Sequence, residues 1–167
     1  MPLPGAPPSP SLAPWLEVGN VRLAGRILAG YQRAFGRPLL AAAARDISSC
    51  SLAQELFRAD TVVLAHNGLA DPQLTYANAA ALALWQRPWS VMVGLPSRLT
   101  AEPQERASRA QALAAALQHE AIAHYSGVRI DSRGRRFRIH GARLWTLRDG
   151  QGQPCGQAAA FDQWWWL

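Results

Sequence analysis

The sequence predicts an α+β domain in which an antiparallel sheet of about five strands is covered on one face by helices, with an N-terminal helical extension. Three observations lead to this class. Apolar residues recur at helical spacing near the N-terminus and again over residues 103–125. Short apolar segments bounded by turn residues occur at 61–66 and 74–77. From residue 126 the period becomes two, and turn signals divide the chain into three strands, which suits one antiparallel sheet.

The N-terminal third divides into a leader and a helical extension. Residues 1–14 contain six of the twelve prolines, so we expect a disordered leader there. The extension is predicted over residues 15–59. An amphipathic helix begins near Val21 and ends near Gly36, because Pro38 blocks its continuation. A second helical segment is predicted at 38–47. A third begins at Ser51, which has capping-box spacing to Gln54.

Residues 60–167 are predicted to form the main domain. The segments 61–66 and 74–77 are expected strands, and Asn78 caps a short helix over 79–85. A helical turn at 88–93 ends at Gly94. The alanine-rich segment from Pro103 to about Tyr125 is the longest predicted helix. Three strands follow, at 128–131, 136–148 and 155–161, and a Gly134-containing turn joins the first two.

Composition and motifs exclude several classes of protein. No apolar stretch, residues 39–44 included, is long enough to span a membrane, and no basic segment followed by an apolar one marks a secretory signal. Two cysteines make no disulfide framework, so we expect a cytoplasmic protein. The common catalytic motifs are missing, which favours a protein that is not an enzyme. The histidines and cysteines lack metal-ligand spacing, so no metal site is predicted.

A resemblance sharpens this expectation. The stretch "LTYANAAALALWQRPWSVMVGLP", residues 74–96, resembles the signature of PAS domains, with Asn78, Trp85 and the Gly94-Leu95-Pro96 turn at matching positions. Together with "VGLPSRLTAEP", "YSGVRIDSRGRRFRI" and "GQAAAF", it is similar to bacterial members of the MEKHLA family, which are PAS-related. The resemblance implies a PAS-like sensory or regulatory module that holds a small molecule between sheet and helices, or that binds a signalling protein. The MEKHLA domain also occurs in plant regulators that carry a homeodomain and a leucine zipper. The sequence contains neither of these DNA-binding segments, so nucleic acid is not an expected partner.

The same resemblance bears on cofactors. In haem-binding PAS domains a histidine on the long helix ligates the iron, and His124 falls on the apolar side of the helix predicted here. A histidine near a helix C-terminus more often complements the helix dipole, so haem is not expected. Flavin is not expected either, because the Asn-Cys-Arg-Phe-Leu run of Light-Oxygen-Voltage (LOV) domains is missing after "VGLPSRL".

A candidate ligand site lies where the long helix faces the sheet. Its predicted members are Trp85, Leu117, His124, Arg143 and Trp145. Arg143 shares strand parity with Trp145, so it is a cation on an otherwise apolar face and needs a partner. It binds an anionic ligand, forms a structural ion pair, or is turned outward by a bulge at Gly141.

Basic residues concentrate in two segments, where an anionic partner is one hypothesis. The candidates are Arg22, Arg26, Arg33 and Arg37 on the first helix and Arg135, Arg136 and Arg138 on the hairpin. The simpler interpretation is a solvated helix face and a charged strand edge. We favour it because nucleic-acid binders usually interleave aromatics or lysines with their arginines, and this chain contains no lysine. A further alternative is a dimerisation adaptor that uses the first helix and the C-terminal tryptophans, residues 164–166, which should alternate between the two faces of a strand.

Overall fold

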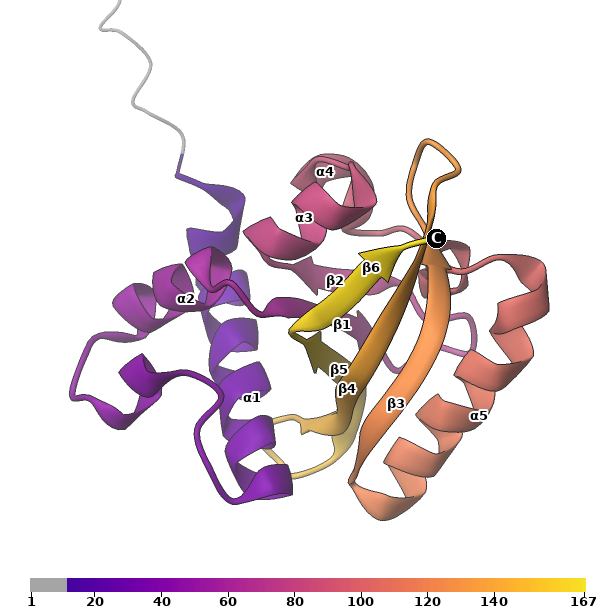
Figure 1. The fold of residues 1–167 in the computed structure, drawn as a ribbon. Helices are drawn as coiled ribbons and strands as arrows, with labels where there is room; N and C mark the ends of the chain where they lie inside the picture. Colours follow the sequence, from indigo (N-terminus) through magenta and orange to yellow (C-terminus); the bar gives the residue numbers. More distant parts are fainter. Residues whose placement is uncertain (1–11) are drawn as a thin grey trace, which may run out of the picture.

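The computed structural model describes residues 12–167, so most of the predicted proline-rich leader, 1–14, lies outside the described residues. Figure 1 shows the order of elements along the chain. The helices are η1 (Pro14–Leu16), α1 (Val18–Phe35), η2 (Ala41–Ala44), α2 (Ser49–Arg58), α3 (Ala79–Trp85), α4 (Trp89–Met92), η3 (Ser97–Thr100) and α5 (Pro103–His119). The strands are β1 (Val62–Asn67), β2 (Leu74–Ala77), β3 (Ala121–Ile130), β4 (Arg136–Arg148), β5 (Pro154–Phe161) and β6 (Gln163–Trp166).

The strands form one antiparallel sheet in the order β2-β1-β5-β4-β3, and β6 pairs with β4. Strand β4 is long enough to pair with two strands along the same edge. Its second half pairs with β5 from Arg143 onward, and its first half pairs with β6 over Phe137–His140. The predicted α+β class with an antiparallel sheet is therefore confirmed, with six strands in place of about five.

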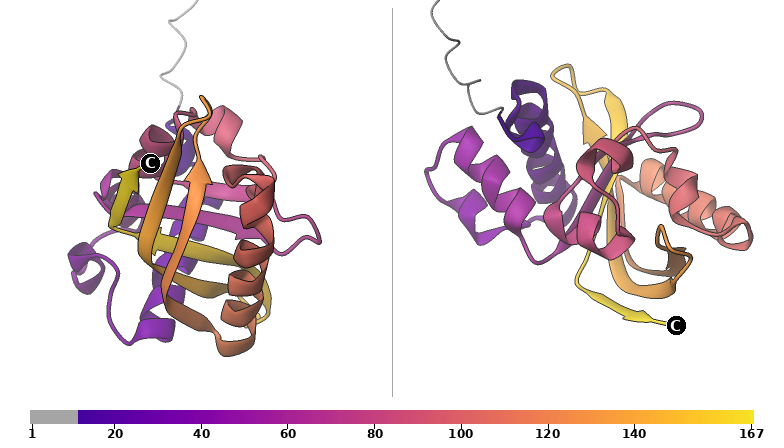
Figure 2. Two further views of the ribbon diagram at one scale, coloured as in Figure 1. Left: turned by 45° about the vertical axis from the view of Figure 1, so that its right-hand side comes forward. Right: turned by 90° about the horizontal axis from the view of Figure 1, so that it is seen from above.

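Helices cover both faces of this sheet. Figure 2 shows α5 on one side of the strands and α1 with α2 on the other. On the α5 side, Trp85 of α3 packs against Phe137 and Phe161. On the other side, α1 packs against Trp145 and Leu147. The predicted N-terminal extension is thus part of the same body, because its apolar stripe is buried on the sheet face opposite α5.

Helix α1 shows how the sequence makes this contact. Its buried residues follow helical spacing, and Gly36 ends it in the left-handed region at φ 70°. At Gly30 an added Cβ would lie 3.0 Å from Cδ1 of Trp145, so glycine lets the helix approach β4 this closely without a shift of the indole ring. Trp145 is fully buried there, and its Nε1 donates to the carbonyl of Ile27 at 3.0 Å.

Asn78 fixes the start of α3, as predicted. Its side-chain oxygen accepts from the backbone N–H of Ala81 at 3.2 Å, which is the N-cap bond, and also from that of Val63 at 3.0 Å. Its amide nitrogen donates to the carbonyls of Thr61 and Leu56, at 2.7 and 3.2 Å. One buried side chain therefore joins α2, β1 and α3.

Three helix boundaries differ from the sequence prediction. The segment 38–47 forms only the 3₁₀ turn η2. Helix α2 begins earlier than Ser51, because Ser48 is its N-cap and accepts from the N–H of Ser51 at 3.1 Å. Helix α5 ends at His119, because Glu120 adopts a positive φ of 67° and turns the chain into β3. Ala121 and Ile122 could continue the helix, but they pair with β4 and therefore form a strand.

A bulge in the middle of β4 changes which face its residues occupy. Gly127 of β3 pairs with Ile139, but Tyr125 pairs with Ala142, so one residue on β3 opposes two on β4. Gly141, at φ 65°, supplies the left-handed conformation that this bulge requires. Beyond it, Arg143 and later odd-numbered residues lie on the α1 face. Arg143 and Trp145 therefore share one face, as expected, but it is the α1 face and not the face under α5.

Candidate functional site

A cavity of about 50 Å³ lies between α5 and the sheet. Its walls are mostly aliphatic and aromatic side chains from β1, β2, α3, α5, β3, β4 and β5. Trp85 lines one side, with its indole nitrogen 3.5 Å from the carbonyl of Thr100. The polar side chains that line it are His66, Thr100, Arg109, Tyr125, Arg129 and Gln157. Enclosed apolar walls with a few convergent polar groups are typical of small-molecule sites.

Arg129 of β3 is a buried cation in this cavity. Its exposed fraction is 6%. Nη1 donates to the carbonyl of Val128 at 2.9 Å, and Nη2 donates to the hydroxyl of Tyr125 at 3.1 Å. Gly127 makes room for this pair, because an added Cβ would lie 2.7 Å from the Tyr125 oxygen and 2.9 Å from Nη1 of Arg129. No carboxylate among residues 12–167 forms an ion pair with it.

A second guanidinium faces the same space from α5. Arg109 lies one turn before Ala112 and Leu113, which also line the cavity. Burial, and to a smaller extent the positive charge of Arg129, lower the pKa of Arg109 to about 10, although Tyr125 acts in the opposite direction. Arg109 still carries its charge at neutral pH. Among the described residues it has no carboxylate partner either.

His66 of β1 adds a neutral polar group. Burial lowers its pKa, the bond to the carbonyl of Asn67 raises it, and the charge of Arg109 lowers it again, with a net decrease. Nδ1 lies 2.8 Å from the Asn67 carbonyl, which only accepts, so Nδ1 is assigned as the protonated nitrogen. Nε2 is then an acceptor. It is buried and has no hydrogen-bond partner within the described part of the chain.

A surface groove of about 410 Å³ adjoins the cavity and shares four lining residues with it, which are His66, Arg109, Leu113 and Gln157. We call it the outer groove. Arg98 and Arg106 also line it, and Arg98 pairs with Asp71 at 3.2 Å. The side chains of His66 and Arg109 therefore stand between the cavity and a basic surface groove.

The structure places the predicted ligand residues in four locations. Trp85 lines the cavity. Leu117 is 54% exposed and lines the outer groove, because α5 is rotated so that Ala116 faces the sheet. Trp145 packs on the opposite sheet face under α1. His124 is not on the long helix, because that helix ends at His119; it is exposed on β3. His124 lines a separate surface groove at the bulge.

Arg143 also lies at this bulge groove, whose volume is about 480 Å³. Nη1 donates to the hydroxyl of Tyr31 at 2.7 Å, and Nη2 pairs with Asp162 at 2.8 Å. The guanidinium also lies 5.5 Å from the centre of the Tyr31 ring. Of the three alternatives for Arg143, the structure combines the bulge at Gly141 with the structural ion pair.

The arginines of the first predicted basic segment occupy different surroundings on α1 and beyond it. Arg22 is exposed, and Arg26 is half-buried. Arg37 lines the bulge groove. Arg33 contacts β4, where its Nη2 donates to the carbonyl of Thr146 at 3.4 Å. Three of these four side chains are exposed, and only Arg26 is half-buried.

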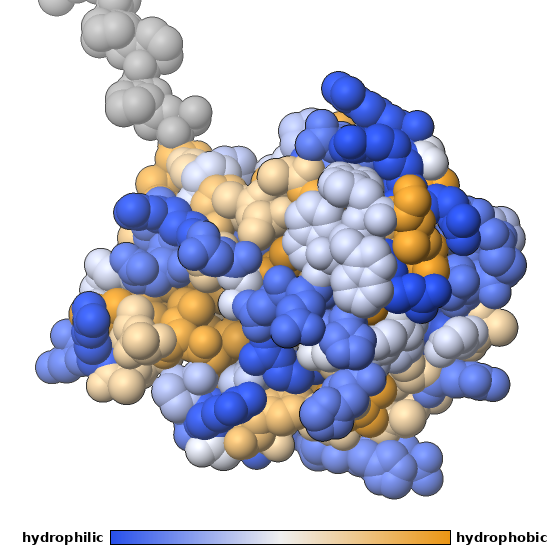
Figure 3. Space-filling model, in the orientation of Figure 1, coloured by the Kyte–Doolittle hydropathy of each residue, from blue (hydrophilic) through white to orange (hydrophobic). Residues whose placement is uncertain are grey.

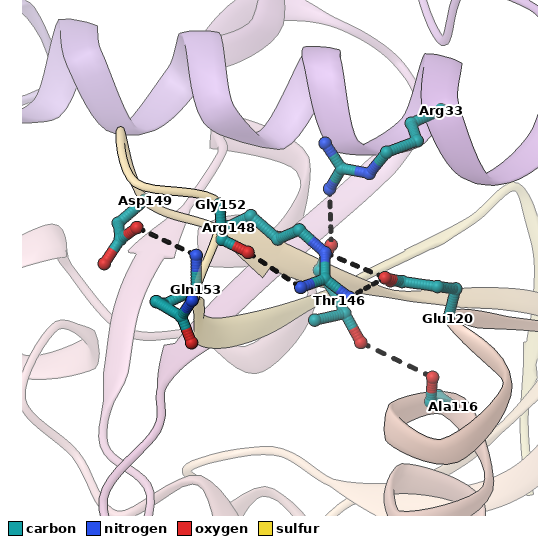
Figure 4. A network of polar contacts seen from close by, with 8 residues as sticks. All are labelled: Arg33, Ala116, Glu120, Thr146, Arg148, Asp149, Gly152 and Gln153. Atoms are coloured by element: carbon teal, nitrogen blue, oxygen red, sulfur yellow. Dashed lines mark hydrogen bonds and ion pairs between the residues drawn. The ribbon is translucent and has the colours of Figure 1, made fainter.

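Thr146 connects α1 with the end of α5, as Figure 4 shows. Its backbone N–H donates to the carbonyl of Glu120 at 3.0 Å, and its hydroxyl donates to that of Ala116 at 3.4 Å. The Glu120 carboxylate in turn pairs with Arg148, which also donates to the carbonyl of Gly152 at 2.8 Å. The helix over the cavity is therefore bonded to the strand that carries α1.

The hairpin arginines are largely paired. Arg135 pairs with Asp131 at 2.9 Å and lies 4.1 Å from the centre of the Trp166 ring. Arg136 pairs with Glu102 at 2.7 Å, and Arg138 is half-buried on β4. Arg136 and Arg138 nevertheless lie on β4, which pairs with β3 on one side and with β6 on the other, so the interpretation of a charged strand edge is wrong.

Sequence reasoning missed the two arginines that line the cavity. Arg129 alternates with the apolar residues Val128 and Ile130, a pattern typical of a solvent-facing side chain, although β3 is buried on both faces there. The available signal was helical spacing, because Arg109 precedes Ala112, Leu113 and Ala116 at i+3, i+4 and i+7.

Within residues 12–167, no group of His, Cys, Asp or Glu is arranged to hold a metal ion. In the same part of the chain, no helix has the length and apolar character needed to cross a bilayer.

Comparison with known proteins agrees with the fold. The family model of the MEKHLA domain matches residues 21–166. A LOV domain studied with a flavin analogue has a TM-score of 0.55 at 18% identity, over 70% of this chain and 84% of its own. The PAS domain of a protein from Colwellia psychrerythraea has a TM-score of 0.59 at 10% identity, over 68% of this chain and 94% of its own.

An RNA-binding LOV receptor has a TM-score of 0.56 at 18% identity, covering 70% of this chain and 34% of the receptor. The search of curated proteins finds no match. At these identities the structural likeness establishes a PAS-like fold.

Proposed function

The chain belongs to the MEKHLA domain family, and we propose that it is a PAS-like sensory or regulatory module that binds a small molecule in the cavity between α5 and the sheet. In this proposal the domain does not catalyse a reaction. Binding changes how α5 lies on the sheet, and the contacts of Thr146 with Ala116, Glu120 and Arg33 connect that change to α1.

One observation carries the proposal: Arg129 is a buried guanidinium in an apolar cavity, without an ion-pair partner in the described residues. A charge removed from water and left unpaired costs free energy that folding alone does not repay. Binding sites retain such groups because the ligand provides the missing partner. The polar groups around Arg129 are suited to binding, since guanidinium, phenol and amide side chains orient a small molecule by hydrogen bonds.

The size of the cavity favours a small ligand over the large cofactors found in some PAS-like proteins. A volume of about 50 Å³ accommodates only about four water-sized groups, far fewer than the ring system of flavin or haem. His124 also lies on β3 and lines the bulge groove instead of the cavity. We therefore propose a small metabolite as the ligand and no prosthetic group.

The test is to identify what the purified protein carries. Mass spectrometry of small molecules released on denaturation should detect one compound near stoichiometric amount, or a metabolite library should contain a compound that raises the Tm. Ala112→Leu fills the cavity from α5 and should abolish binding. Ala107→Leu, on the exposed side of the same helix, is the matched control. A protein that carries nothing and binds no library compound would contradict the proposal.

Protein interaction is the second candidate, and β6 favours it. Trp164, Trp165 and Trp166 are 36%, 47% and 41% exposed on a strand that pairs with β4. Trp164 and Trp166 pack edge-on against Phe137, while Trp165 lies over His140, so the expected alternation is confirmed. Figure 3 shows a pale area over β6 bordered by strongly hydrophilic residues.

Self-association through this strand is tested by light scattering. Wild type should be a dimer in this alternative, and Trp165→Ser should be a monomer with unchanged Tm. The first helix is a poor dimer element by comparison, because its apolar stripe is buried on β4. A wild-type protein that is monomeric at high concentration would exclude self-association through β6.

A further inference from the structure

The charges in the cavity define what kind of molecule it takes. Arg109 and Arg129 both face it, and no Asp or Glu side chain lines it. Each guanidinium has five N–H donors, and Arg129 uses two of them, toward Val128 and Tyr125. The donors that remain are suited to the two oxygens of a carboxylate, which match guanidinium geometry. An anion between the two cations would also remove their mutual repulsion, which contributes to the lowered pKa of Arg109.

His66 supplies the opposite chemistry. Its Nδ1–H is used by the Asn67 carbonyl, and its Nε2 is a buried acceptor without a partner in the described residues. A neutral imidazole in this state requires a donor, such as a hydroxyl group. A ligand that carries only a carboxylate would satisfy the arginines and leave this nitrogen unpaired.

The volume of the cavity and its connection to the outer groove further limit which ligands fit. The cavity volume of about 50 Å³ corresponds to about four water-sized groups, which matches an acid of about two to four carbons. Its remaining walls are apolar and suit the carbon atoms of such a molecule. The outer groove, with Arg98 and Arg106, gives an anion an attractive path toward Arg109.

We propose that the cavity binds a small hydroxycarboxylate, whose carboxylate lies between Arg109 and Arg129 and whose hydroxyl donates to Nε2 of His66. This inference rests on the proposed function, because it names the ligand class of the same cavity. The inference goes beyond the proposed function because it requires that the ligand carry both a negative charge and a hydroxyl group.

Three probes of similar size separate these requirements. Lactate has a carboxylate and a hydroxyl, propionate has only the carboxylate, and 1,2-propanediol has only hydroxyls. We expect lactate to bind best in a buffer without other carboxylates, with a Tm rise of about 5 °C or more at 100-fold excess over Kd. Propionate should bind about 3- to 10-fold more weakly, because it leaves Nε2 unpaired. The diol should not bind.

Substitutions of Arg129 and Arg109 test whether each guanidinium binds the carboxylate. Arg129→Met and Arg109→Met should each weaken lactate binding about 10- to 100-fold, as expected for a lost charged hydrogen-bond pair. Arg133→Met removes the same charge from the exposed hairpin turn and should leave binding unchanged. Arg129→Lys keeps the charge without the bidentate geometry and should restore only part of the affinity.

Stability of the unliganded variants checks folding at the same time. Arg129→Met should have an equal or higher Tm than wild type without ligand, because the unpaired buried charge is gone. A variant that is as stable as wild type and no longer binds lactate supports the inference.

Several results would overturn the inference. One is a diol that binds as well as lactate, and another is an Arg129→Met protein with wild-type lactate affinity. The absence of a Tm shift with either acid at about 20 mM would also exclude a small carboxylate. If mass spectrometry finds a neutral or cationic ligand, the hydroxycarboxylate is excluded while the proposed function stands. If the protein binds no library compound at all, the proposed function fails as well.

Discussion

Replacing Asn78 by alanine should destabilise the domain strongly, because this side chain satisfies backbone groups from three elements. It caps α3 through Ala81, and it also accepts from Val63 and donates to Thr61 and Leu56. Loss of the N-cap bond alone costs about 1 kcal/mol. Each buried backbone group that loses its partner adds about 1 kcal/mol or more, so the total should be about 3–5 kcal/mol.

Urea denaturation followed by far-UV circular dichroism measures this loss. The midpoint should fall while the m-value stays constant, which shows that the folded and unfolded states keep their compactness. Asn78→Asp is the informative comparison, because it keeps the accepting oxygen but replaces the donor amide by an oxygen that faces the carbonyls of Thr61 and Leu56. It should be at least as destabilised as Asn78→Ala. A loss below about 1 kcal/mol in the alanine variant would refute the reasoning, since capping alone would then explain it.

Three further predictions concern the sheet. Burial raises the pKa of Asp131, but hydrogen bonds from Arg135 and the charge of Arg135 lower it more, so the net change is a decrease. The ionised carboxylate therefore stabilises the folded state above pH about 4, and this stabilisation is lost as pH falls through the folded pKa. Asp131→Asn should therefore flatten acid unfolding curves. Gly141→Ala should cost about 1–2 kcal/mol in urea, because φ is 65° while an added Cβ meets nothing within 4 Å; an unchanged midpoint would show that the bulge rearranges. Arg143→Met should lower the Tm, because it leaves the Tyr31 hydroxyl without its donor, whereas Tyr31→Phe in the Arg143→Met background should then have little additional effect.

Local signals in the sequence sufficed where the structure depends on neighbouring residues. The helix that ends at Gly36, the Asn78 cap and the turn before Gly134 all follow from residue types with fixed backbone preferences. The resemblance over residues 74–96 added the PAS-like arrangement of these elements, which the family match supports.

Tertiary contacts decided what local signals did not. The residues after His119 tolerate helix, and only pairing with β4 makes them a strand. The bulge at Gly141 shifts Arg143 and Trp145 to the α1 face. Gly141 indicated a bulge as one alternative for Arg143, but the alternation of residues alone did not decide between the alternatives. The arginines of the cavity were missed for a physical reason: a charged residue is expected in solvent unless a partner is known, and here the proposed partner is a ligand.

The position of α1 has a consequence for any protein that associates with this domain. The helix covers Trp145 and Leu147 on the sheet face opposite α5, so that face is occupied by the chain itself. A partner aimed at these strands has to displace a tethered competitor, whose effective concentration is on the order of millimolar. Weak partners are thereby excluded, and loosening of α1 at Arg33 would open the face to them.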